Sequence, residues 1–107
     1  MKTAITSTGN TPNALLDQRF GRCSYFAIYD DDTDSIEYIP NPNKEADEGA
    51  GPASLQLVAS KGVQKVISGE FGANVKTVFD SLRIQLVILN NSDKTINDII
   101  QLINHKK

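Results

Sequence analysis

Residues 19–23, Arg-Phe-Gly-Arg-Cys, bring together side chains that can bind an anion and a metal. Arg19 and Arg22 carry guanidinium groups, which hold anions through charge-assisted hydrogen bonds. Cys23 offers a thiol, and a thiolate is a soft ligand suited to iron, molybdenum or copper. The neighbouring arginines would lower the pKa of that thiol. This segment therefore predicts a site for an anion with a soft, metal-containing part.

Each of these side chains also has an interpretation without a ligand. Cys23 fits a small, inert residue at the start of a strand, since free cysteines are often buried. Arg19 and Arg22 fit solvated charges that pair with Asp17, and exposed pairs add only about 0–1 kcal/mol of stability. We interpret Phe20 as an apolar plug that anchors a long loop, with stacking on a cluster or shielding of it as the alternative.

Glycines flank the starts of two expected helices. Residues 49–51, Gly-Ala-Gly, precede a helix that we expect to begin at Pro52, where a missing N–H does no harm. Gly69 and Gly72 precede a helix expected over residues 73–82. Glycine lets backbone N–H groups approach a ligand closely, and helix N-termini carry partial positive charge. Neither glycine pair is a Walker A loop, because no Gly-Lys-Ser/Thr follows.

The pattern of apolar residues predicts eight secondary-structure elements in the order β-β-β-α-β-α-β-α. Short runs of β-forming residues indicate strands, and apolar positions spaced i, i+3, i+4, i+7 indicate helices. The last helix begins with a capping box from Thr95 to Asp98. The last strand has five apolar residues in six, which predicts burial on both faces. The expected strands are residues 3–6, 25–29, 36–39, 63–67 and 84–89, and the expected helices run from Pro52 to a stop at Gly62, over 73–82 and over 96–103.

These elements predict one α/β domain over residues 1–107, a five-stranded mixed sheet with three helices. The first three strands favour an antiparallel meander, and strands 4 and 5 are each followed by a helix, which favours parallel pairing. The simplest sheet order is 3-2-1-4-5. Strands 1, 3 and 4 then end at one edge, where the loops 7–22, 40–51 and 68–72 meet. Strand order reverses at strand 1, and open α/β sheets bind ligands at such a point.

Size and charge exclude several classes of protein. The chain has 107 residues, a mass of 11.7 kDa and a formal charge of −2. Such a domain lacks the positive field that holds nucleic acid or anionic membranes. No apolar run is long enough to span a bilayer, and we expect no signal region at the start of the chain. The single cysteine excludes an internal disulfide and predicts a reducing cytoplasm, and the lack of a long exposed apolar stripe predicts a monomer.

Four sequence motifs occur together in an order typical of a known family. They are Asp17 to Phe26 around the two arginines, Asn41-Pro42, Gly49-Ala50-Gly51, and Gly69 to Gly72 followed by Asn74. With these motifs the sequence resembles the dinitrogenase iron–molybdenum cofactor biosynthesis family. This is the domain shared by NifX-like and NafY-like accessory proteins and by the C-terminal part of NifB. The resemblance covers essentially the whole chain.

The resemblance implies a ribonuclease-H-like α/β fold with a five-stranded mixed sheet. It also implies binding or carriage of an iron–sulfur or iron–molybdenum type cluster, or its precursor, without catalysis and with cluster-assembly proteins as partners. Accessory members carry a histidine, the cluster ligand, directly before Phe-Gly. Here that position is Arg19, which has no free lone pair for a metal while protonated. With the loop analysis, the resemblance assigns cofactor binding to Arg19, Phe20, Gly21, Arg22, Gly49, Gly51, Gly69 and Gly72, and metal binding to Cys23.

Two other functions compete with cluster binding. A two-metal nuclease needs several carboxylates that converge on the sheet. Residues 2–7 carry none, and the strand 63–67 offers only Glu70 just past its end. We therefore expect no enzymatic activity. A regulatory or interaction domain that binds a protein or a phosphate-bearing small molecule at the same sheet edge is the alternative to a cluster carrier.

Overall fold

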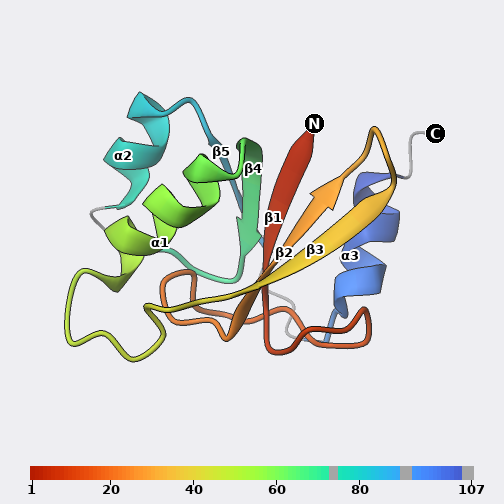
Figure 1. The fold of residues 1–107 in the computed structure, drawn as a ribbon, viewed down its shortest axis with the longest axis horizontal. Helices are drawn as coiled ribbons and strands as arrows, with labels where there is room; N and C mark the ends of the chain where they lie inside the picture. Colours follow the sequence, from red (N-terminus) through yellow and green to blue (C-terminus); the bar gives the residue numbers. More distant parts are fainter. Residues whose placement is uncertain (73–74, 90–92, 105–107) are drawn as a thin grey trace.

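The computed structural model describes residues 1–72, 75–89 and 93–104. Within these ranges five strands and three helices follow one another in the predicted order (Figure 1). Residues 73 and 74, which include Asn74 of the family motif and the expected start of the second helix, lie outside the described residues. The elements are β1 Lys2–Ser7, β2 Tyr25–Asp30, β3 Ser35–Pro40, α1 Ala50–Ser60, β4 Val63–Ser68, α2 Val75–Ser81, β5 Gln85–Ile88 and α3 Ile96–Ile103.

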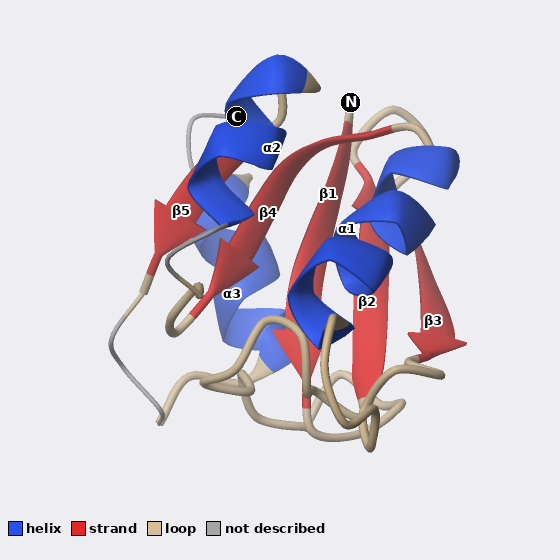
Figure 2. Cartoon of the chain, turned by 90° about the vertical axis from the view of Figure 1, so that its left-hand side faces the viewer, coloured by secondary structure: helices blue, strands red, loops and turns tan. Residues whose placement is uncertain are grey.

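The described strands form a mixed sheet in the order β3-β2-β1-β4-β5, as predicted. β1 pairs antiparallel with β2, and β2 pairs antiparallel with β3, whereas β4 runs parallel to both β1 and β5. α1 and α2 cover one face of the sheet and α3 covers the other (Figures 1 and 2). The strands β1, β3 and β4 therefore point toward the same edge, and the loops that leave them begin side by side.

The central strand β1 separates two layers of core. Its residues from Thr3 to Ser7 are buried, and successive side chains point to opposite faces of the sheet. Ala4 packs in the layer beneath α1 and α2, together with Leu55 and Phe79. Ile5 packs in the layer beneath α3. Because apolar groups cover both faces of β1, the loop that follows it starts from a firmly packed strand.

α1 begins two residues earlier than the sequence indicates. The helix starts at Ala50, so Pro52 is its third residue rather than its first. The first four N–H groups of a helix have no partner within it, and a proline therefore does no harm elsewhere in the first turn. The N-cap is Gly49, at φ 75°. At the other end Gly62, at φ 79°, donates its N–H to the carbonyl of Ala59, which confirms the predicted stop.

β5 is less buried than its composition indicates. It lies at one edge of the sheet and pairs with β4. Leu86 and Val87 pack on opposite faces of the sheet but are only half-buried, and Ile88 is 59% exposed. The prediction of burial on both faces is therefore wrong, because an edge strand has a neighbouring strand on one side alone.

α3 begins with the capping box that the sequence predicts. The hydroxyl of Thr95 accepts a hydrogen bond from the N–H of Asp98 at 3.1 Å, and the Asp98 carboxylate accepts one from the N–H of Thr95 at 3.1 Å. The apolar stripe of the helix faces the sheet, with Ile96, Ile99 and Ile100 buried. None of the helices in the described ranges has the length and apolar character needed to cross a membrane.

Replacing Thr95 with alanine removes the side-chain oxygen that caps α3. Loss of an N-cap costs about 1 kcal/mol, and we expect that decrease in the free energy of unfolding of Thr95→Ala, measured by urea denaturation. Gln101→Ala, at an exposed position of the same helix, is the control and should change that free energy by less than about 0.5 kcal/mol. Equal effects of the two substitutions would contradict the capping role.

Candidate functional site

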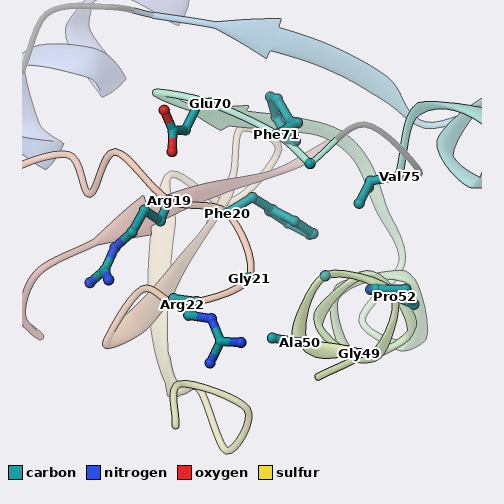
Figure 3. Close-up of a pocket in the computed structure, with 12 residues that line it drawn as sticks. Arg19, Phe20, Gly21, Arg22, Gly49, Ala50, Pro52, Glu70, Phe71 and Val75 are labelled. Carbon is teal, nitrogen blue, oxygen red and sulfur yellow. The ribbon is translucent and has the colours of Figure 1, made fainter. Parts of the chain in front are cut away.

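A pocket of about 530 Å³ opens at the sheet edge where β1 and β4 end. Three segments far apart in the sequence form most of it: the arginine segment (residues 19–23, of which 19–22 line the pocket), the start of α1, and the turn after β4 (Figure 3). Val75 of α2 completes the lining. The structure thus brings together most of the residues predicted for the site, whose role in binding stays a prediction. The predicted residues that line the pocket are Arg19, Phe20, Gly21, Arg22, Gly49, Gly51 and Gly72.

Hydrogen bonds hold the arginine segment against the ends of β1 and β4. The N–H of Asp17 donates to the carbonyl of Thr6 at 2.9 Å, and the Thr6 hydroxyl donates to the carbonyl of Asp17 at 2.7 Å. The N–H of Arg19 donates to the Asp17 carboxylate at 3.0 Å. Next along the chain, the N–H of Phe20 donates to the carbonyl of Glu70 at 3.3 Å. The segment is therefore tied to two strands at once.

Phe20 anchors the arginine segment in the core. It is buried, and its ring lies 5.4 Å from the rings of Phe71 and Phe79 and 5.8 Å from that of Phe26, measured between centroids. Aromatic rings at these separations and tilts attract one another. The interpretation of Phe20 as an apolar anchor of the loop is consistent with this burial. Together with Phe71 it also supplies an apolar wall of the pocket.

The arginine segment meets the first turn of α1 backbone to backbone. A Cβ atom on Gly21 would lie 2.8 Å from the nitrogen of Gly51 and 3.0 Å from its Cα. A Cβ atom cannot lie this close to backbone atoms that have no room to move. A larger residue at Gly21 must therefore displace the helix. This contact holds the backbone of the arginine segment against the N-terminus of α1.

The N-terminus of α1 adds positive charge to the pocket. Its N-cap, Gly49, has no side chain to accept a hydrogen bond, and the first turn contains no acidic residue. The unpaired N–H groups of a helix start carry partial positive charge, which favours anions. Ala50 and Pro52 of the same turn also line the pocket. The helix end and the guanidinium groups therefore favour the same kind of ligand.

The two arginines are held differently. Nη1 of Arg22 donates to the carbonyl of Lys44 at 3.3 Å and to that of Ala46. Arg22 thereby fastens the rim loop, residues 41–49, to the pocket. The side chain of Arg19 is 56% exposed, and its Nε lies 3.8 Å from the Asp17 carboxylate. A pair with one exposed partner contributes little, so Arg19 is the freer guanidinium to meet an anion.

Asn41 joins the rim loop, the arginine segment and α1 through its buried side-chain amide. Its Nδ2 donates to the carbonyls of Gly21 and Cys23, both at 3.0 Å. Its Oδ1 accepts from the N–H of Asn43 at 3.0 Å and from the hydroxyl of Ser54 at 3.4 Å. In the sequence Asn41 stands out only as part of the family motif, and no pattern of neighbouring residues indicates this bridging role.

Cys23 lies in the core and does not line the pocket. It is fully buried, and its Sγ donates to the carbonyl of Phe20 at 3.4 Å. Burial, with a further contribution from the negative charge of Asp17, raises the pKa of the thiol to about 12. The expectation that the arginines lower this pKa is therefore wrong, because the thiol packs with the apolar residues under α1 and away from the guanidinium groups.

Gly69 lies outside the pocket lining, and its predicted role in cofactor binding stays a prediction. It is buried, and a Cβ atom there would come within 2.3 Å of the Gln18 side chain. Its small size serves packing between the turn and the arginine segment. Glu70 and Phe71, the two residues between the glycines of this turn, do line the pocket, as does Val75 of α2. The glycines of this turn stand out in the sequence, whereas nothing there distinguishes Val75 from the other apolar residues of its helix.

The described lining residues can bind an anion but offer few metal ligands. None of them is a histidine or a cysteine, and Glu70 is the only carboxylate among them. Elsewhere the carboxylates of Asp30, Asp31 and Asp32 lie within 4.8 Å of one another. The Met1 ammonium group pairs with two of them, at 2.9 and 3.2 Å, and so supplies positive charge to that cluster. The pocket therefore suits a ligand held by charge and hydrogen bonds.

Comparison with known proteins matches the chain to one family almost from end to end. Residues 1–106 match the family described as dinitrogenase iron-molybdenum cofactor. An uncharacterized protein of Methanocaldococcus jannaschii is 31% identical over 93 residues, which cover 84% of this chain and 77% of that protein.

Solved structures share the fold over nearly the whole chain. The apo form of the orange protein from Desulfovibrio gigas has a TM-score of 0.90 at 24% identity, covering 98% of this chain and 88% of that chain. At that identity the likeness shows a common fold. A putative NifB protein from Thermotoga has a TM-score of 0.82 at 27% identity, covering 97% of this chain and 87% of that chain.

Gly21→Ala tests the backbone contact on which the pocket is built. The added methyl group forces the arginine segment and α1 apart, and such overpacking costs about 2 kcal/mol of the free energy of unfolding, measured by urea denaturation. Gly72→Ala is the matched control, because the nearest atom to its added Cβ lies 3.7 Å away. It should change that free energy by less than about 0.5 kcal/mol. A Gly21→Ala protein as stable as wild type would contradict the close contact.

The raised pKa of Cys23 predicts a thiol that does not react in the folded protein. Well below a pKa of about 12 the group stays protonated, and the protonated form is not nucleophilic. At pH 8, Ellman's reagent should therefore release almost no chromophore from native protein, but one equivalent per chain from protein unfolded in urea. Rapid reaction of the native protein would show that Cys23 is accessible as thiolate.

Proposed function

The chain belongs to the dinitrogenase iron-molybdenum cofactor family, and from this premise we propose that it binds an anionic metal–sulfur cluster, or a precursor of one, in the pocket beside α1. A cofactor-binding or carrier role fits the family and the structural neighbours. The cluster is cargo that the protein holds and hands on, and the protein catalyses no reaction on it.

The convergence of positive groups on one pocket carries this proposal. Arg19 and Arg22 flank a glycine whose backbone touches the uncapped start of α1. Guanidinium groups and helix N-termini both favour negative charge, and their effects add when they face the same ligand. The family suggests which kind of anion is bound, and the arginines and the start of α1 are the groups that would hold it.

The remaining walls favour a soft anion over a small hydrated one. Phe20, Phe71, Pro52 and Val75 give the pocket apolar walls beside its charged groups. Ligand pockets commonly combine such apolar walls with a few placed polar groups. A cluster with sulfide ions on its surface is large and polarizable, and it gives up water more readily than a compact oxyanion does. Its sulfides can lie against the aromatic rings while its charge faces the arginines.

The cargo must bring its own metal ligands. No described lining residue offers a thiol or an imidazole, and the thiol of Cys23 is buried behind Phe20. A metal that needed protein thiolates would find none in this pocket. We therefore propose a cluster whose metals stay saturated with sulfide and are held by charge and hydrogen bonds. Cluster-assembly proteins would deliver and receive it, in a cytoplasm reducing enough to preserve the sulfide ligands.

Tetrathiomolybdate, a stable anion with soft sulfide ligands, tests the proposal as a probe. Wild-type protein should bind one tetrathiomolybdate ion per chain. Binding is measured by equilibrium dialysis and by the visible absorption of the ion. Arg19→Ala removes one charge-assisted contact and should weaken binding about tenfold or more. Arg22→Lys keeps a charge but not the paired hydrogen bonds, and should weaken it less.

Lys61→Ala is the control for loss of one positive charge. Lys61 caps the opposite end of α1, away from the pocket, and its removal should change the affinity less than about twofold at moderate salt. No binding to wild type, or equal losses in the Arg19 and Lys61 variants, would refute the proposal. Tight binding of inorganic phosphate with none of tetrathiomolybdate would favour a regulatory domain that recognises phosphate-bearing molecules.

A further inference from the structure

Glu70 places a negative charge in the wall of a pocket that is otherwise positive. Glu70 is one of the residues that line the pocket, next to Phe71, and Figure 3 shows its carboxylate on the same side as Arg19, at the outer margin of the site. A carboxylate repels anions, so its presence is unexpected in a site built from arginines and a helix N-terminus. The family resemblance assigned no role to it.

The backbone keeps Glu70 at this place. Its carbonyl accepts hydrogen bonds from the N–H of Phe20 at 3.3 Å and from the hydroxyl of Ser68 at 3.4 Å. The preceding residue, Gly69, is buried against the side chain of Gln18. The turn therefore cannot swing Glu70 out of the pocket without breaking contacts in the core.

The carboxylate of Glu70 has no partner within the part of the chain that the structure describes. No hydrogen bond or ion pair joins it to a described residue, and the closest carboxylate to the Arg19 guanidinium is that of Asp17, at 3.8 Å. Glu70 is exposed, so water and salt weaken its field, but at low salt an unpaired carboxylate at the pocket wall still repels an anion that enters. No side-chain hydrogen bond or ion pair to a described residue commits this carboxylate to the fold.

We propose that Glu70 determines specificity by excluding small, highly charged oxyanions such as phosphate and sulfate. Coulomb repulsion falls with distance, and a compact dianion held by Arg19 has its whole charge close to the Glu70 carboxylate. A larger sulfide-covered anion, tetrathiomolybdate included, has its charge spread over several polarizable sulfur atoms, so less of that charge lies close to Glu70. The identity of the favoured anion rests on the proposed function, whereas the exclusion of phosphate does not.

Glu70→Gln tests the inference, because it removes the charge and keeps the size of the side chain. Inorganic phosphate binding is measured by titration calorimetry at pH 7.5 in low salt, where the dianion predominates. We expect Glu70→Gln to bind phosphate at least about tenfold more tightly than wild type, and Glu70→Asp to exclude it as wild type does. Asp80→Asn makes the same change of charge at an exposed position of α2 outside the pocket lining and should leave phosphate binding unchanged.

The affinity for tetrathiomolybdate, measured in the same variants, separates this inference from the proposed function. A gain for phosphate that clearly exceeds the gain for tetrathiomolybdate supports Glu70 as the specificity determinant. Equal gains for both anions, or no gain for phosphate, overturn it. If wild type binds no tetrathiomolybdate but Glu70→Gln gains phosphate and Asp80→Asn does not, the proposed cargo is wrong while the exclusion of phosphate by Glu70 stands.

Discussion

The backbone contact between Gly21 and Gly51 is the constraint on which the whole pocket depends. Because Gly21 has no Cβ, the loop that leaves β1 reaches the first turn of α1 without an intervening side chain. Guanidinium groups and helix dipole can therefore act on one volume, and charges separated by the width of a side chain would act much more weakly together. The aromatic contacts of Phe20 and the amide of Asn41 hold the two segments in this position.

The sequence predicts the fold well because the relevant signals are local or follow general rules of connection. Alternating and helical periodicities locate every element, and the handedness of crossovers leaves few sheet orders to choose from. The predictions fail where the burial or the start of an element depends on the elements and backbone around it. The apolar β5 turned out to be an edge strand with Ile88 exposed, and α1 starts before Pro52 because its first turn tolerates a proline at several positions.

The site is predicted in part, since chain direction alone brings the arginines and glycines to one edge. The direction in which a side chain points depends on packing that the sequence does not display. Cys23 directly follows Arg22 in the sequence, yet its thiol packs into the core and the pKa of the thiol rises. A side chain on Gly69 would collide with Gln18, and this packing requirement cannot be read from the sequence. The roles of Asn41 and Glu70 depend on partners, or on their absence among the described residues, and single-residue patterns do not reveal either.

The hydrogen bond from Ser54 to the carbonyl of Gly21 spans 33 residues, and the turn after β4 adds a wall still later in the chain. No short stretch of this polypeptide contains all the segments that form the pocket. During synthesis the arginines leave the ribosome long before the helix and the turn that complete their surroundings. The pocket therefore takes shape only after β4 and the turn that follows it have been synthesised.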